Sequence, residues 1–380
     1  MQHIGAAVAG TGFIGPVHVE GLQRLGVNVR GILGSSPEKS KRACQQMGLD
    51  VAYSSFDEIL QDDSVDVVHL AVPNVLHFDM SKRALEAGKH VMCEKPLAMV
   101  AEESEELVRI AKASGKAAAV CYNQRFYPLN LEARARIAGG EIGDVFTIKG
   151  SYVQDWLLYD TDYNWRVLSE QGGELRAISD IGTHWMDLVC SISGLEVEAV
   201  FADLKTVHPV RKRPLGEIAT FTSGGGNQET EPIPITTDDS GAVLFRFKGG
   251  QRGILWVSQV TAGRKNNMQY EIAGSKGAFH WHSQTPNSLW IGHRDKANEV
   301  LTRDPGFMTD MARTYTNYPG GHHEGFPDTF KQCFRAFYTA IDQGIPEEDA
   351  LYPTFSEGHR EIQLCDAILE SHKEEKWVYV

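Results

Sequence analysis

Three glycines near the start of the chain have the spacing of a phosphate-binding turn. Residues 10–15 read Gly-Thr-Gly-Phe-Ile-Gly, directly after the apolar run 4–9. Gly10 would make the tight turn, Gly12 would clear space for the phosphates, and Gly15 would let helix and strand pack closely. Free N–H groups at the start of the following helix attract an anion. We predict a dinucleotide-binding turn here, with a purely structural glycine turn as the alternative.

A lysine stands where a parallel sheet places its ligands. Glu94-Lys95-Pro96 follows the predicted strand 90–93, and open α/β sheets bind ligands at the carboxyl ends of their strands. The Lys95 ammonium could stabilise an alkoxide that forms during hydride transfer. The alternative is a surface turn with a solvated lysine.

A carboxylate and an imidazole stand four residues apart in a predicted helix. Asp180 and His184 would be neighbours on one helix face. A carboxylate beside an imidazole orients the ring and raises its basicity, which suits a base that accepts a hydroxyl proton near neutral pH. A surface Asp/His pair without catalytic work is the alternative.

The elements that must position these residues change in character near residue 122. Up to residue 121, short apolar strands alternate with helices, the rhythm of a doubly wound parallel sheet. Strands are predicted at 4–9, 27–33, 65–72, 90–93 and 117–121, and helices at 36–47, 75–87 and 101–114. We therefore expect an α/β dinucleotide-binding domain of the Rossmann type over residues 1–122.

Beyond residue 122 the pattern favours an α+β domain over residues 123–380, with one large, mostly antiparallel sheet. Its predicted strands are 145–153, 197–207, 242–247, 253–260 and 269–273, and its predicted helices are 129–138, 179–193, 326–342 and 356–372. Ser223 to Gly226, with polar neighbours, is expected to be a mobile loop.

Composition narrows the class of protein. The chain has 380 residues and a formal net charge of −13, which argues against a nucleic-acid partner. No run of 18 apolar residues predicts a membrane span, and no export signal is recognised at the N-terminus. Its six cysteines are scattered without a CxxC pair. We expect a cytoplasmic protein with reduced thiols.

Taken in order, four segments carry a family resemblance. They are the turn 10–15, Glu94-Lys95-Pro96, Asn164-Trp165-Arg166 and Asp180-Ile181-Gly182-Thr183-His184. Together they resemble the glucose–fructose oxidoreductase / inositol dehydrogenase / rhizopine-catabolism (Gfo/Idh/MocA) family. The resemblance implies that His184 is the general base, that Lys95 stabilises the alkoxide, and that Asp180 orients the base or shares its proton. Some members carry Tyr in place of the histidine.

The same resemblance implies most of the cofactor and substrate contacts. Arg125 lies with Asn123 at the domain junction, and Arg166 could meet phosphate or make an interdomain salt bridge. The expected cofactor-binding residues are Gly10, Gly12, Phe13, Ile14, Gly15, Ser35, Ser36, Lys39, Pro73, Asn74, His77, Glu94, Lys95, Asn123, Trp165 and Arg166. The expected substrate-binding residues are Lys95, Trp156, Trp165, Asp180, His184, His322 and His323.

The end of the second predicted strand bears on the choice between NAD and NADP. An NAD enzyme usually has an acid there for the ribose 2′-hydroxyl, but this chain has Gly34. Ser35 and Ser36 could bind a 2′-phosphate, with Lys39 and Arg42 adding positive charge. NADP is slightly favoured, NAD or dual use stays open, and Glu38 is the nearest acid.

The segment Gly320-Gly321-His322-His323-Glu324 invites a metal-site interpretation, which we do not adopt. Adjacent histidines cannot easily reach one ion with good geometry, and no third group of ligands is in view. A loop that lines a sugar site is favoured instead. The aromatic side chains of Trp156 and Trp165 could stack on a sugar ring, whereas Tyr152 is expected in the core.

The sequence thus predicts an NAD(P)-dependent oxidoreductase that acts on a ring hydroxyl or ketone of a sugar, glycoside or cyclitol, without a metal. Two alternatives stay open: an NAD-retaining glycoside hydrolase that works by transient redox, and a non-catalytic regulator that senses cofactor or sugar. An exposed broad sheet usually needs a partner, and the resemblance implies a homodimer or homotetramer formed through it.

Overall fold

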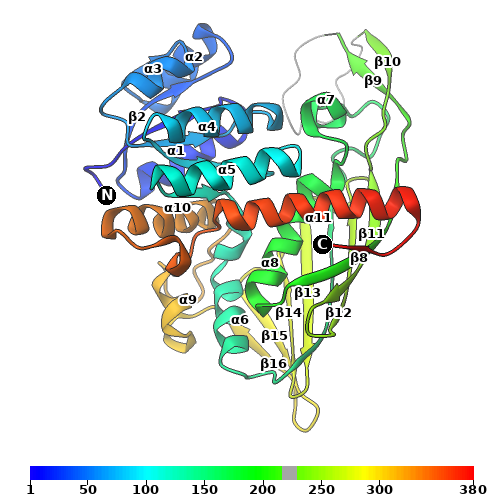
Figure 1. Cartoon of the computed structure of the whole chain (residues 1–380). Coiled ribbons are helices and arrows are strands. Elements are labelled where there is room, and N and C mark those ends of the chain that lie inside the picture. The colour runs from blue at the N-terminus through cyan, green and yellow to red at the C-terminus, as the bar shows by residue number, and fades with distance from the viewer. Residues whose placement is uncertain (216–228) are drawn as a thin grey trace. The chain divides into compact units, whose positions relative to one another are not determined.

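The computed structural model describes residues 1–215 and 229–380, which form two compact units (Figure 1). The first unit comprises Met1–Asn123 and Pro327–Ile362, and the second comprises Gln124–Phe326 and Gln363–Val380. The first break thus falls one residue from the expected boundary. Residues 327–362 differ from the expectation, because they pack with the N-terminal segment. The expected loop at Ser223 to Gly226 lies outside the described residues.

The first unit contains a six-stranded parallel sheet with the strand order β3-β2-β1-β4-β5-β6. The strands are β1 (Gly5–Ala9), β2 (Asn28–Leu33), β3 (Val51–Tyr53), β4 (Val67–Leu70), β5 (His90–Cys93) and β6 (Ala118–Val120). The order reverses between β1 and β4, which is where such sheets bind ligands. The doubly wound α/β fold is confirmed, and β3, a three-residue edge strand, was not predicted from the sequence.

Helices cover the sheet, and all of them except α10, which comes much later in the chain, lie between its strands in the sequence (Figure 1). They are α1 (Ile14–Arg24), α2 (Pro37–Met47), α3 (Phe56–Gln61), α4 (His77–Glu86), α5 (Ala101–Ser114) and α10 (Phe326–Gln343). Each residue of β1 and β4 is buried, as expected for parallel strands that are covered on both faces. The exception to their apolar character is His69 in β4, which is 0 % exposed.

The second unit contains a nine-stranded sheet with the order β16-β15-β14-β13-β7-β12-β11-β8-β17. The strands are β7 (Val145–Val153), β8 (Val197–Lys205), β11 (Ser240–Phe247), β12 (Arg252–Ser258), β13 (Asn267–Gly274), β14 (Ala278–His282), β15 (Ser288–Gly292), β16 (Glu299–Thr302) and β17 (Val378–Tyr379). Only β7 and β12 pair in parallel among the described strands of this sheet, which confirms the mostly antiparallel prediction. A separate hairpin joins β9 (Val210–Pro214) and β10 (Thr230–Pro234).

The helices α6 (Pro128–Ala138) and α8 (Thr183–Ser193) lie on one face of this large sheet (Figure 1). Side chains alternate along its strands, so that Phe245 and Leu255 are buried while Leu244, Ile254 and Trp256 are exposed. The short helices α7 (Ser169–Gly172) and α9 (Asp310–Thr314) lie in connections. The last helix, α11, spans Phe355–Glu374, and the division between the units falls within it.

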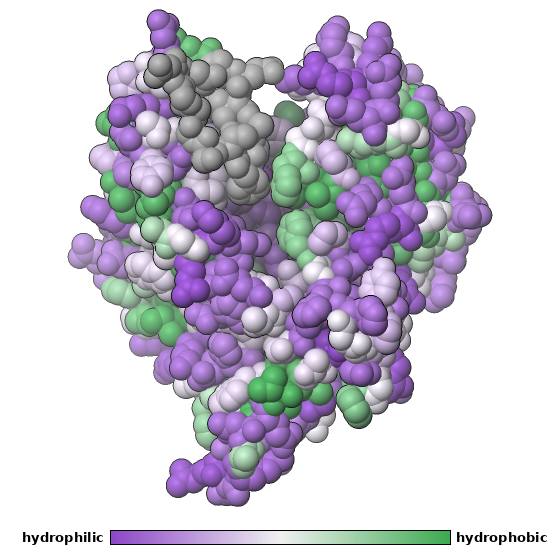
Figure 2. All heavy atoms as spheres, turned by 180° about the vertical axis from the view of Figure 1, so that it is seen from behind, coloured by the Kyte–Doolittle hydropathy of each residue, from purple (hydrophilic) through white to green (hydrophobic). Residues whose placement is uncertain are grey.

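The surface carries both polar and apolar residues. On the face drawn in Figure 2, hydrophilic residues predominate and hydrophobic residues form separate patches. None of the helices in the described ranges combines the length and the apolar character that a membrane crossing requires.

Candidate functional site

The glycine turn joins β1 to α1, as expected of a dinucleotide-binding turn. Gly10 has a φ of +120°, and a Cβ there would lie 2.0 Å from the Ala71 carbonyl oxygen. A Cβ on Gly15 would lie 2.0 Å from the Gly10 carbonyl oxygen, so both positions demand glycine. A Cβ on Gly12 would instead meet nothing within 4 Å. Among the described residues no side chain caps the start of α1, whose N–H groups therefore suit a phosphate.

The turn after β2 is tightly packed. A Cβ on Gly34 would lie 2.9 Å from the Lys39 Cβ, so this position has no room for a carboxylate without movement. Ser36 caps α2 by accepting the Lys39 N–H at 3.3 Å, and Ser40 Oγ accepts the Gly34 N–H at 2.8 Å. Ser35 is exposed next to this capped helix start. These residues fit a nucleotide ribose bearing either a hydroxyl or a phosphate.

The turn after β5 holds Lys95 through its neighbours. His77 is buried at the start of α4, and its ring nitrogens lie 2.7 Å from the Pro96 oxygen and 3.0 Å from the Val72 oxygen. Burial lowers the pKa of His77, which favours the neutral ring. The ring thereby ties the Lys95-Pro96 turn to the end of β4. Pro73 and Asn74 lie in that same connection, where Asn74 begins a 3₁₀ turn.

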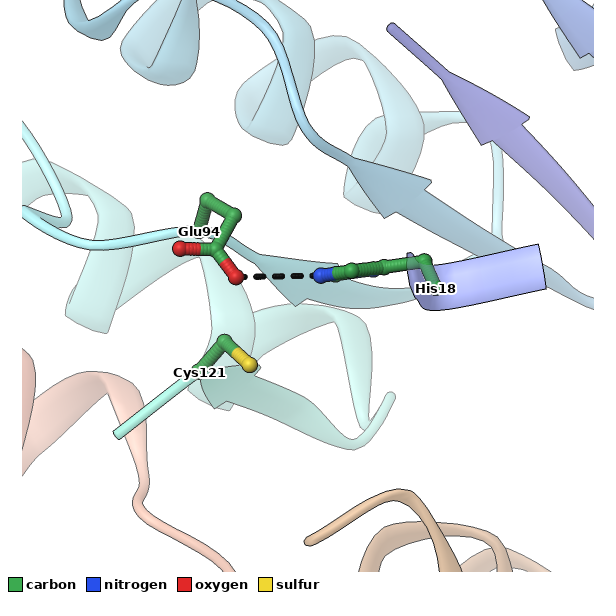
Figure 3. Close-up of side chains that lie close together, drawn as sticks. All are labelled: His18, Glu94 and Cys121. Atoms are coloured by element: carbon green, nitrogen blue, oxygen red, sulfur yellow. Dashed lines mark hydrogen bonds and ion pairs between the residues drawn. The ribbon is translucent and has the colours of Figure 1, made fainter. Parts of the chain in front are cut away.

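Behind the Lys95 turn, Glu94 lies against His18 and Cys121 (Figure 3). The Glu94 Oε1 and His18 Nε2 atoms are 3.0 Å apart, and the three ligand-type atoms of this group lie within 4.8 Å of one another. Burial raises the pKa of Glu94, but the hydrogen bond from His18 and the positive charges of the basic side chains beside it, His18 and Lys95, outweigh burial and lower that pKa to about 2. Because hydrogen bonds already satisfy the carboxylate, we interpret the group as a hydrogen-bond cluster.

Asn123, predicted to bind the cofactor, donates a hydrogen bond from Nδ2 to Thr329 Oγ1 at 2.7 Å, buried within the first unit. Arg125 forms a buried ion pair with Asp187 of α8, in the second unit, with 2.8 Å between Nε and Oδ2. These partners lie far away in the sequence, so neither was visible in the motifs.

Asp180 lies in a π-helical turn, Ile178–Gly182, that directly precedes α8. The sequence predicted one regular α-helix here. The expectation that Asp180 and His184 are neighbours on one helix face assumed regular α-helical geometry, which this turn does not have. Such wide turns are frequent at functional sites. Gln259 Nε2 donates to Asp180 Oδ2 at 2.8 Å, and Arg166 Nε lies 3.4 Å from Asp180 Oδ1. The carboxylate is thus held at both oxygens.

Arg166 thus forms an ion pair within the second unit, which is not the interdomain salt bridge that the sequence left open beside a phosphate contact. Its guanidinium also lies over the Trp165 ring, with 4.5 Å between Cζ and the ring centroid, and contacts Asn164 Oδ1 at 3.3 Å. Trp165 and Arg166 both come from a 3₁₀ turn that Asn164 caps. This places two predicted cofactor residues beside the predicted orienting carboxylate, all within the second unit.

His184 is the second residue of α8 and is 7 % exposed. Its ring lies 6.4 Å from the ring of Tyr152, which is buried as predicted and donates to Asn266 Oδ1 at 2.6 Å. The His184 imidazole is therefore largely shielded from bulk water.

A buried ion cluster that the sequence did not reveal fixes the start of the Asp180 segment. Arg176 and Arg211 both pair with Asp239, and all three side chains are at most 1 % exposed. Next to them, Asp238 accepts the N–H groups of Arg176 at 2.6 Å and Ile178 at 3.0 Å. The cluster joins the π-helical turn to the sheet. In the sequence, the one local sign of this cluster is the pair of adjacent acids, Asp238 and Asp239.

The His322-His323 segment forms an anchored loop. Both histidines are exposed, whereas Glu324 is buried and its Oε2 lies 2.9 Å from Arg303 Nη1. Arg303 also donates to the carbonyl oxygens of Tyr318, Pro319 and His322. Glu324 thus serves the loop as an internal ion-pair partner.

Trp156 is partly buried and packs against the small apolar cluster of Leu157, Val167 and Ile235. Its Nε1 donates a hydrogen bond to Gln154 Oε1 at 2.8 Å.

The residues that the sequence predicted to bind cofactor or substrate fall into two sets, one in each unit. The first unit holds the glycine turn, Ser35, Ser36, Lys39, Pro73, Asn74, His77, Glu94, Lys95 and Asn123, and the second holds Trp156, Trp165, Arg166, Asp180, His184, His322 and His323.

Comparison with known proteins adds independent findings. Residues 4–122 match a family model described as "Oxidoreductase family, NAD-binding Rossmann fold", and residues 130–280 match the "GFO/IDH/MocA C-terminal domain". A levoglucosan dehydrogenase of Pseudarthrobacter phenanthrenivorans is 29 % identical, covering 100 % of this chain and 99 % of the relative. An NADP-linked scyllo-inositol 2-dehydrogenase of Bacillus subtilis is 25 % identical, covering 85 % and 81 %.

Solved structures agree with these matches. A levoglucosan dehydrogenase in complex with NADH and L-sorbose has a TM-score of 0.89 at 28 % identity, covering 100 % of this chain and 99 % of the other. An inositol dehydrogenase homolog from Azotobacter vinelandii, at 24 % identity and a TM-score of 0.88 over 100 % and 98 % of the two chains, shows the same fold. Both parts of the sequence thus match one family, and the chain belongs to the Gfo/Idh/MocA oxidoreductases.

Proposed function

We propose that this protein transfers a hydride between a nicotinamide cofactor and a ring CH–OH group of a sugar, anhydrosugar or cyclitol. The observation that carries this proposal is the similarity to a levoglucosan dehydrogenase along essentially the whole of both chains. The glycine turn supports it, because Gly12 leaves open the space that a pyrophosphate needs.

Bound NAD(P) would supply the hydride acceptor, held by the glycine turn and the residues after β2. We propose that the His184 imidazole accepts the proton of the substrate hydroxyl, and that the Lys95 ammonium donates a hydrogen bond to the same oxygen. Asp180 would act as an orienting carboxylate, because Gln259 and Arg166 already occupy its two oxygens. Exposed His322 and His323 are proposed to bind substrate hydroxyls from their anchored loop.

The decisive experiment is a screen for cofactor reduction. Purified protein is incubated with NAD or NADP and with inositols, hexoses, glucosides or anhydrosugars such as levoglucosan. Appearance of reduced nicotinamide with one of these classes would support the proposal. Cleavage of a nitrophenyl glycoside without net reduction of the cofactor would instead indicate an NAD-retaining glycoside hydrolase. Sugar binding without turnover across the panel would indicate a non-catalytic regulator.

We further propose that NADP is accepted at least as well as NAD. Gly34 has no carboxylate that would repel a 2′-phosphate, and Ser35 and Lys39 are close to Gly34. One similar structure contains NADH, and another relative is named as NADP-linked. Membership of the family therefore does not by itself decide between NAD and NADP.

A charge at residue 35 is expected to shift this preference. In Ser35→Asp, repulsion of the 2′-phosphate should lower the ratio of kcat/KM for NADP to that for NAD by about tenfold or more, which corresponds to about 1.4 kcal/mol. Ser35→Asn is the matched neutral control. Equal ratios in the two variants would show that the 2′-phosphate does not bind here.

The exposed face of the large sheet is proposed to mediate homo-oligomerisation. Leu244, Ile254 and Trp256 are 40–46 % exposed, and Leu244 pairs with Ile254 across β11 and β12. Contiguous apolar side chains on one face suggest a partner surface. Wild-type protein should therefore sediment as a dimer or tetramer, and Trp256→Glu should shift it toward the monomer. A monomeric wild-type protein would rule this out.

A further inference from the structure

A line of buried polar side chains crosses the first unit and ends at the Lys95 turn. Tyr338 Oη of α10 lies 3.0 Å from His69 Nε2 of β4, and His69 Nδ1 lies 3.0 Å from His18 Nδ1 of α1. His18 Nε2 lies 3.0 Å from Glu94 Oε1, directly after β5 (Figure 3). The two histidines and the tyrosine are 0 % exposed. Each ring nitrogen of the two histidines thus has one partner.

The hydrogen bonds of this line have one direction. Glu94 is ionised, so its Oε1 can only accept, and His18 must donate from Nε2. If this is the only proton on the His18 ring, His18 accepts at Nδ1, which requires His69 to donate from its own Nδ1. His69 in turn accepts at Nε2 from the Tyr338 hydroxyl. Every proton therefore points toward Glu94, with the tautomers assigned from these contacts.

The opposite arrangement leaves a group unsatisfied. If His18 were doubly protonated, His69 would accept at Nδ1 and donate from Nε2 to the Tyr338 oxygen. The Tyr338 hydroxyl proton would then lack an acceptor among the hydrogen bonds of the described residues, inside a fully buried side chain. An unmet buried donor is costly. Burial lowers the pKa of His69 well below its ordinary value, so this ring is neutral in both arrangements, and the unmet Tyr338 donor is what separates them.

The aromatic surroundings keep both imidazoles in place. The Phe334 ring lies 4.8 Å from each of the His18 and His69 rings, and the Tyr338 ring stacks on His69 with centroids 5.9 Å apart. At the other end, Glu94 Oε2 accepts the backbone N–H of Lys95 at 3.3 Å. The line thus runs from the core of α10 to the peptide group of the proposed catalytic lysine.

We propose that Tyr338, His69 and His18 are positioning residues, which act through Glu94 to hold the Lys95 backbone. Because the line ends at the buried Tyr338 hydroxyl, it has no route by which to carry protons to water. Its role is to fix the orientation of the Glu94 carboxylate. The catalytic part of this inference rests on the proposed function, because it concerns the lysine that stabilises the reacting oxygen.

The direction of the line can be tested without substrate, by NMR of ¹⁵N-histidine-labelled wild-type protein. We expect His18 protonated at Nε2 only and His69 protonated at Nδ1 only, with a ¹⁵N–¹⁵N scalar coupling between the two Nδ1 atoms across their hydrogen bond. A doubly protonated His18, or a His69 protonated at Nε2, would overturn the assignment. This measurement is independent of whether any sugar is a substrate.

The positioning role is tested with Tyr338→Phe, which removes only the first donor. Tyr352→Phe is the matched control, because Tyr352 is a buried tyrosine of the same unit that packs on Phe337 and has no contact with the line among the described interactions. We expect faster amide exchange at Lys95 and a kcat about threefold to tenfold lower in Tyr338→Phe, with the KM for cofactor unchanged. Tyr352→Phe should match the wild type.

Two results would overturn the positioning role. One is an unchanged Lys95 amide exchange rate in Tyr338→Phe. The other is an equal fall of kcat in both tyrosine variants, which would indicate a general loss of packing. If Tyr338→Phe does not fold, Glu94→Gln tests the last step of the line, because its amide oxygen can accept from only one of the two donors, His18 and Lys95, and an unchanged Lys95 exchange rate in that variant would overturn the positioning role. If no substrate is found in the screen, the proposed function fails while the exchange measurement still decides this inference.

Discussion

Replacing Lys95 or His184 with alanine is expected to lower kcat by about 10²–10⁴-fold, the usual contribution of a positioned proton acceptor or charge-stabilising group. Without His184 the hydroxyl proton has no base, and without Lys95 the developing negative charge has no cation beside it. Cofactor affinity should change little, because the glycine turn and the segment after β2 are intact in both variants. Stopped-flow turnover and fluorescence titration of NAD(P) separate the two effects.

The double variant gives the sharper result. Groups that act on one transition state lose activity non-additively, so Lys95→Ala/His184→Ala should be much less impaired than the product of the single losses. Lys112→Ala and His3→Ala are suitable controls, because both side chains are exposed. Strictly multiplicative losses would argue that the two residues serve different steps. Near-wild-type turnover in both single variants would remove them from the mechanism.

The parts of the site that could be predicted from the sequence are those encoded locally. The turn at residues 10–15 needs glycines because of contacts made within a few residues or with the neighbouring strand, and the spacing of those glycines is visible in the chain. The end of β5 could be placed for the same reason, since four consecutive apolar or half-buried residues precede Glu94. Both regions follow the rule that strands of a parallel sheet are continuously buried.

The parts that could not be predicted depend on partners distant in the chain. Gln259 meets Asp180 across 79 residues, and Tyr338 meets His69 across 269. No periodicity reports such contacts. The π-helical turn at Asp180 could not be predicted either, because the apolar pattern of residues 179–193 indicates a helix but not how its first turn is wound. Likewise, the amphipathic pattern of α10 indicates that it packs, but not against which sheet.

The ionic groups around Asp180 show how a local motif depends on such distant partners. Asp239 Oδ1 accepts from Arg176 and, at 2.7 Å, from Arg211 Nη2. Its Oδ2 accepts the N–H groups of Val207 and His208 at 2.7 and 3.0 Å. Burial raises the pKa of Asp239, but the charge of Arg176 and these N–H groups outweigh it and lower that pKa. Two guanidinium groups in the protein interior are therefore neutralised largely through one carboxylate.

Removing that single charge is expected to be among the most destabilising conservative changes in the chain. Asp239→Asn would leave Arg176 and Arg211 buried without their counter-ion, and breaking a buried pair typically costs about 3–5 kcal/mol of unfolding free energy. Asp160→Asn is the control, because the Asp160–Lys212 pair is 44 % and 51 % exposed and such pairs contribute about 0–1 kcal/mol. Urea unfolding followed by circular dichroism measures both.

The same variant also links stability to the site. Arg176 lies two residues before the π-helical turn, so its release should free Asp180 from its fixed place and reduce kcat even at temperatures where Asp239→Asn stays folded. A loss of stability equal to that of Asp160→Asn would show that water or relaxed packing compensates the two arginines. Normal kcat in a strongly destabilised Asp239→Asn would show that Gln259 and Arg166 hold Asp180 by themselves, and that the buried cluster serves folding alone.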